Sequence, residues 1–125
     1  RGGSLTGNAG ALDLLARGLV DLFVADYHAP ALLAAVYKAA DEGLVDLPAA
    51  VRLVTAAPAA AVGLGDRGVI APGARADLII SERHGGLPVV DATLLAGDLI
   101  YTAGPFAPAL APILAAAPIP QPAER

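Results

Sequence analysis

The sequence predicts an α/β fold in which an apolar strand between helices is followed by a small antiparallel β-sheet. Residues 19–25 form a short, nearly continuous apolar run that ends at Asp26, as in a strand buried in a parallel sheet. Apolar residues at helical spacing follow this run, and short apolar segments separated by glycine turns come later. In an α/β barrel, the C-terminal tip of such a strand is where catalytic and metal-binding groups collect. Asp26 is therefore the first candidate for a functional residue.

The order of elements is expected to be loop, helix, strand, helices, sheet and tail. Gly18 and Gly43 are typical helix stops, and Pro30 suits the first turn of a helix. The expected helices cover residues 9–16, 31–42, 47–54 and 59–62. The expected strands of the sheet cover residues 76–81, 88–95 and 98–101, joined by glycine turns. From Gly104 onward six prolines fall among alanines, so residues 104–125 are expected to be an extended or disordered tail.

Composition excludes several classes of function. The net charge of −4 provides no basic stripe for nucleic acid, and no apolar run approaches the roughly 18 residues of a membrane span. The chain has no cysteine, which excludes disulfides and thiolate metal sites. We expect a cytoplasmic protein without nucleic-acid or membrane partners.

The glycine-dense opening segment, residues 1–8, has the chemistry of an anion site. Its glycines permit backbone amides to converge, and its polar side chains lie just before a helix. The candidate phosphate-binding residues are Arg1, Gly2, Gly3, Ser4 and Asn8. The alternative is a flexible turn in which Asn8 is the N-cap of the next helix, and both can hold together.

The sequence around the helix-to-sheet crossover resembles the C-terminal portion of the amidohydrolase superfamily. Residues 53–59 read Leu-Val-Thr-Ala-Ala-Pro-Ala, and residues 73–78 read Gly-Ala-Arg-Ala-Asp-Leu, which matches the Gly-x-x-Ala-Asp-Leu motif of the superfamily. The resemblance spans residues 1–101. It implies that residues 1–62 are the C-terminal end of a metal-dependent (β/α)8 barrel and that residues 63–103 are part of a small β-sandwich.

The opening segment and Asp26-Tyr27 are similar to the phosphonate-metabolism branch of that superfamily. The branch carries Arg-Gly-Gly-Ser-His-Ser-Gly-Asn and Ser-Ser-Asp-Tyr at these places, whereas this chain has Leu5 in place of the histidine and Val24-Ala25 in place of the serines. The resemblance implies a hydrolase that cleaves a ribose 5-triphosphate carrying a 1-phosphonate and releases pyrophosphate, so the expected partner is a phosphorylated small molecule. The open alternatives are a hydrolase of C–N bonds, such as a cyclic amidase or deaminase, and a non-catalytic remnant or binding module.

The same resemblance assigns roles to residues. Asp26 would ligate a divalent metal, expected to be zinc, and would take a proton from the attacking water. The superfamily's His-x-His pair and later metal ligands have no counterpart among these residues. We therefore expect a fragment of a homo-oligomeric enzyme that by itself is inactive and binds no metal tightly.

Other polar residues have simpler explanations. From spacing alone, Asp26 is as compatible with helix capping or ion pairing as with catalysis. His28 and His84 are expected to be exposed histidines without a ligand role. Asp66-Arg67 and Arg75-Ala76-Asp77 are expected to form turns and local ion pairs at the crossover.

Overall fold

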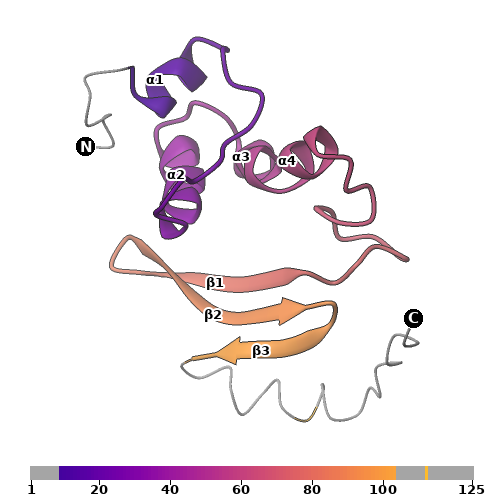
Figure 1. Ribbon diagram of the computed structural model, residues 1–125. Helices are drawn as coiled ribbons and strands as arrows, with labels where there is room; N and C mark the ends of the chain where they lie inside the picture. The colour runs from indigo at the N-terminus through magenta and orange to yellow at the C-terminus, as the bar shows by residue number, and fades with distance from the viewer. Residues whose placement is uncertain (1–8, 104–111, 113–125) are drawn as a thin grey trace. The chain divides into compact units, whose positions relative to one another are not determined.

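Helices occupy the first half of the chain and strands the second (Figure 1). The computed structural model describes residues 9–103 and 112, which divide into two units between Val69 and Ile70. The helices are α1 (Ala11–Ala16), α2 (Pro30–Asp41), α3 (Leu47–Val54) and α4 (Ala56–Ala61). The strands are β1 (Leu78–His84), β2 (Leu87–Leu95) and β3 (Asp98–Thr102).

The helices begin and end where their sequence signals lie. Pro30 occupies the first turn of α2, where the missing amide hydrogen costs nothing. The carboxylate of Asp46 accepts a hydrogen bond from the amide of Ala49 at 2.7 Å and so caps α3. Gly43, just beyond α2, has a φ of +67°, the left-handed conformation that commonly ends a helix. Helix α1 begins at Ala11 with Gly10 as its N-cap, so the alternative role of Asn8, as the N-cap of this helix, is wrong.

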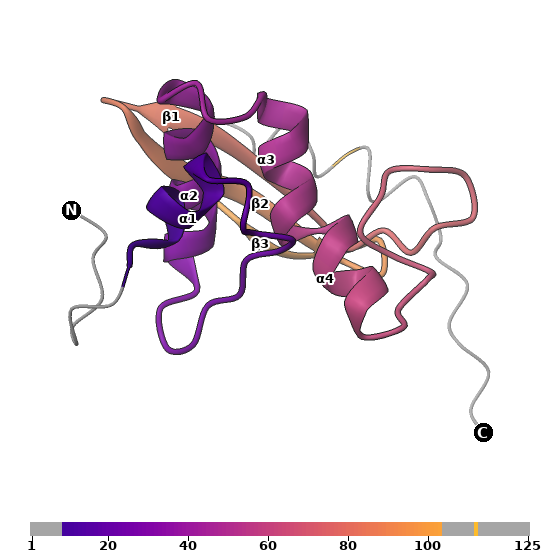
Figure 2. The same cartoon turned by 90° about the horizontal axis from the view of Figure 1, so that it is seen from above.

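The first unit has a small core of short side chains. Helix α2 packs against α3, and α3 contacts α4, which follows it directly along the chain (Figure 2). The buried residues of this core are Leu15, Phe23, Val36, Ala39 and Ala50. Leu15 and Phe23 are the two large side chains among these five residues. The others are valine or alanine, so the core relies on the close approach of helices that alanine permits.

Residues 19–25 do not form the predicted strand. Phe23 is the buried residue of this segment, while Leu19 and Val24 are exposed. The amide of Phe23 donates to the carbonyl oxygen of Leu53 at 2.9 Å, and that carbonyl belongs to the last turn of α3, where no helical donor is available. A strand requires a neighbouring strand to complete its hydrogen bonds, and within residues 9–103 this segment has a helix end instead.

The second unit contains the predicted antiparallel sheet, in the order β1-β2-β3 (Figure 1). Gly85 and Gly86, both with positive φ, form the two-residue turn between β1 and β2. Ala96 (φ +53°) and Gly97 (φ +92°) make the corresponding turn between β2 and β3. Strand β1 continues to His84, beyond the predicted end at residue 81, because its pairing with β2 runs up to that first turn.

Each pair of strands contains an irregularity in register. Ile80 lies opposite Ala92, but Ser81 lies opposite Val90, so Asp91 is an extra residue on β2. Asp91 and Ala92 are the buried residues of the sheet among those described. A buried carboxylate in the central strand is the unusual feature of this unit.

No helix in the described part of the chain is long and apolar enough to cross a membrane. The predicted tail, apart from residue 112, lies outside the described residues. The assignment of residues 1–62 to a barrel and of residues 63–103 to a β-sandwich stays a prediction.

Candidate functional site

Asp26 lies in the segment that connects Phe23 to helix α2. Phe23 fixes the start of this segment by its buried ring and its hydrogen bond to Leu53. Pro30 fixes its end, because α2 begins there. The intervening residues line an open, mainly apolar pocket of about 210 Å³. The pocket is lined by Ala11, Phe23, Val24, Ala25, Asp26, Tyr27, His28, Ala31, Leu32 and Ala35.

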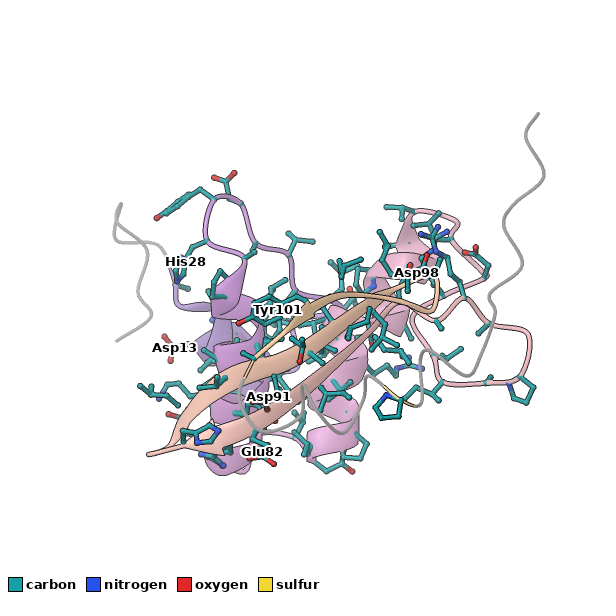
Figure 3. The ribbon with its side chains drawn as sticks, turned by 90° about the horizontal axis from the view of Figure 1, so that it is seen from below. Asp13, His28, Glu82, Asp91, Asp98 and Tyr101 are labelled. Atoms are coloured by element: carbon teal, nitrogen blue, oxygen red, sulfur yellow. The ribbon has the colours of Figure 1, made fainter. Side chains whose placement is uncertain are left out.

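Asp26 and His28 bring a carboxylate and an imidazole to the same pocket. Both residues are exposed, and Figure 3 shows His28 beside the start of α2. Among the described residues, neither side chain makes a hydrogen bond or an ion pair. The N-cap of α2 is Ala29, which has no side-chain acceptor. The structure therefore gives Asp26 neither a capping role nor an ion-pair role within the described residues.

Asp26 and His28 supply two ligand types that suit zinc, an oxygen and an imidazole nitrogen. Within residues 9–103, no group of three converging metal-ligating side chains includes Asp26. The donor set therefore fits one or two positions in the coordination shell of a divalent metal, with the remaining ligands to be supplied from elsewhere. Whether Asp26 is a metal ligand stays a prediction.

The candidate phosphate-binding residues lie outside the described part of the chain. Arg1, Gly2, Gly3, Ser4 and Asn8 all belong to residues 1–8. Their proposed contact with phosphate therefore also stays a prediction.

The charged residues of the crossover form local pairs, as predicted. Arg67 donates to Asp66 through Nε at 2.8 Å and through an Nη at 2.9 Å. Arg75 donates from Nε to Asp77 Oδ1 at 2.9 Å. The same Asp77 oxygen also accepts from the amide of Ala96 at 2.8 Å. The aspartate of the Gly-x-x-Ala-Asp-Leu motif therefore holds a turn of the sheet in place.

The chain belongs to the amidohydrolase family. The model of that family matches residues 23–97, a span that begins at Phe23, includes Asp26 and ends at the turn that Asp77 holds. This match confirms the resemblance drawn from residues 53–59 and 73–78. A fold of the barrel type is implied by the family.

Among curated proteins, the chain is similar to alpha-D-ribose 1-methylphosphonate 5-triphosphate diphosphatase of Escherichia coli (strain K12). The two are 47% identical over 85 residues, which is 66% of this chain and 22% of that enzyme. The chain thus spans about a fifth of the length of this relative. No solved structure matches the chain significantly. The predicted likeness to the phosphonate-metabolism branch is confirmed.

Proposed function

We propose that this chain is the C-terminal part of a metal-dependent diphosphatase that cleaves the triphosphate of alpha-D-ribose 1-methylphosphonate 5-triphosphate and releases pyrophosphate. The observation that carries the proposal is the 47% identity over 85 residues to the diphosphatase of that name. Family membership supports the coarser part, a hydrolase that uses a divalent metal. The rest of the enzyme would supply the remaining metal ligands.

Asp26 is the proposed metal ligand and general base. Its carboxylate is exposed at the pocket and makes no hydrogen bond or ion pair among the described residues, so both oxygens are available. When bound, a divalent cation supplies Lewis acidity at the site. Asp26, at hydrogen-bond distance from the attacking water, would accept a proton from that water. The same contact would orient the lone pair of the water oxygen toward the phosphorus atom.

The proposed phosphate contacts come from the opening segment. Arg1 offers a charge-assisted, two-pronged hydrogen bond, and Ser4 and Asn8 offer neutral donors. Gly2 and Gly3 allow the backbone to approach the anion closely. In barrels of this kind phosphate sites often lie in the loops after the last two strands, which supports this assignment.

The exposed apolar side chains beside Asp26 agree with a larger parent protein. Leu19, Val24 and Tyr27 are 59%, 76% and 82% exposed, although they flank the buried Phe23. A strand of a parallel barrel is covered on both faces. In the complete enzyme we expect neighbouring strands to cover these side chains and to convert residues 19–25 into the eighth strand of the barrel.

The test uses the complete gene product that contains this chain. We would incubate it with zinc and alpha-D-ribose 1-methylphosphonate 5-triphosphate and measure pyrophosphate release. The Asp26→Asn variant should lose activity by roughly 10²-fold or more, because it removes the general base. Asp21→Asn, an exposed aspartate in the same segment, is the matched control and should retain activity. Full activity of the Asp26→Asn variant would remove Asp26 from the mechanism.

Hydrolysis of a C–N bond is the second candidate, and Leu5 favours it. The phosphonate-metabolism branch has histidine at this place, so this chain lacks an imidazole that could bind phosphate or move a proton. Ammonia release or amide cleavage by the same gene product, without pyrophosphate release, would establish this alternative in place of the diphosphatase.

A further inference from the structure

We propose that Glu82, His84 and Asp91 form a divalent-cation site on the sheet of the second unit, with zinc as the preferred ion. Each of the three offers one ligand atom, and these atoms all lie within 4.8 Å of one another. All three residues belong to the second unit, whereas Asp26 belongs to the first. The inference therefore does not depend on the proposed diphosphatase activity.

The strand register brings the three side chains together. Glu82 and His84 are two residues apart on β1, so both side chains project from the same face of that strand. Asp91 lies on β2 as the extra residue at the point where the register slips. Figure 3 labels Asp91 and Glu82 on the sheet. A bulge of this kind re-aims a side chain that regular pairing would place differently, and such bulges are common next to functional sites.

One carboxylate oxygen of Asp91 is buried and lacks a hydrogen-bond partner among the described residues. The residue is 3% exposed, and this oxygen is its Oδ2 atom. Burial of an unpaired carboxylate oxygen is costly, and native proteins compensate such a group with a partner, a water molecule or an ion. A divalent cation held by Asp91 and its two neighbours would supply that compensation.

The three ligands combine one fixed group with two adjustable groups. The carbonyl oxygen of Asp91, in β2, accepts from the amide of Ala103 at 2.7 Å, which ties the Asp91 backbone to the residue that follows β3. The side chains of His84 and Glu82 are 57% and 51% exposed, and their Nε2 and Oε2 atoms are 3.7 Å apart. Ligands at zinc distances in a tetrahedron are about 3.4 Å from one another, so small side-chain rotations would complete the geometry.

The donor set indicates the class of metal. One imidazole and two carboxylates suit zinc, and three protein ligands leave a fourth position for water. Because two of the three ligands are exposed to solvent, we expect affinity in the micromolar range. That affinity is compatible with the expectation that the isolated chain binds no metal tightly.

The test is a titration of the 125-residue chain with zinc chloride by isothermal titration calorimetry. The expected result is one zinc per chain, with affinity at least about tenfold lower in the His84→Gln and Asp91→Asn variants, since each removes a ligand. Asp13→Asn and Asp98→Asn are matched controls, because both residues are exposed and neither belongs to the cluster. Both controls should bind as the unaltered chain does.

A second measurement identifies the ligand directly. In nitrogen-15 NMR of the two imidazoles, the resonances of His84 should shift with one equivalent of zinc and those of His28 should not. His84 is exposed, so the His84→Gln variant is expected to fold normally and decides the question even if Asp91→Asn is unstable. The proposal is overturned if zinc does not bind, if His84→Gln binds as tightly as the unaltered chain, or if the shifts occur at His28 and not at His84.

Discussion

The carboxylate of Asp77 accepts a hydrogen bond from the backbone amide of Ala96, nineteen residues further along the chain, at 2.8 Å. Next to this bond, the amide of Gly97 donates to the carbonyl oxygen of Ala76 at 2.9 Å. Together the two bonds attach the turn between β2 and β3 to the residues that enter β1. The motif aspartate thus connects the start of the sheet to its far turn.

Replacement of Asp77 by Ala should destabilise the second unit by about 1–3 kcal/mol, because the Ala96 amide and the Arg75 guanidinium lose their acceptor. Asp77→Asn keeps one acceptor oxygen and should cost less. Urea unfolding followed by circular dichroism measures the difference, with Asp98→Asn as an exposed control on the same turn. Equal stability of Asp77→Ala and the unaltered chain would contradict this role.

Ala96 is the non-glycine residue with positive φ among those described, at +53°. The left-handed conformation costs an ordinary L-residue about 1–2 kcal/mol, and Asn tolerates it better than Ala does. Asn-Gly is also the preferred pair in a two-residue turn of this type. The Ala96→Asn variant should therefore raise the midpoint of urea unfolding. An unchanged or lower midpoint would show that the turn is not strained.

Gly68 should be far less tolerant of a side chain than Gly63. A Cβ at Gly68 would lie 2.9 Å from the Cα of Ala56 and 3.0 Å from the carbonyl oxygen of Thr55, and both contacts are with backbone. At Gly63 a Cβ meets nothing within 4 Å, although both glycines have positive φ. Gly63→Ala should cost about 1–2 kcal/mol from conformation alone, and Gly68→Ala should cost distinctly more. Thermal unfolding of the two variants side by side checks the order, and a reversed order would contradict the close approach.

Local signals predicted most of the elements in the structure. Pro30 and Gly43 bracket α2, and the Gly85-Gly86 turn places the strands on either side of it, because these residues restrict the backbone directly. The same local chemistry predicted the pairing of Asp66 with Arg67. Such features depend on neighbours in sequence, which the sequence displays.

Features that depend on distant partners were not predictable in this way. Residues 19–25 have the composition of a buried strand, but a strand needs a neighbouring strand to complete its hydrogen bonds. In this structure the Phe23 amide is bonded to the end of a helix instead. The cluster around Asp91 was missed because a one-residue slip in register decides which side chains meet, and no local residue signals it. The only available signal was the pair Glu82 and His84, two residues apart on one strand.

The bond between the Phe23 amide and the Leu53 carbonyl oxygen provides a reporter for the candidate site. Phe23 is three residues before Asp26, and Leu53 is in the last turn of α3, two residues before Thr55, whose carbonyl oxygen lies close to Gly68. Unwinding of that turn would release the Phe23 amide to solvent and free the chain that carries Asp26. Hydrogen exchange at this single amide would therefore show whether a change in the crossover is transmitted to the position of the candidate catalytic carboxylate.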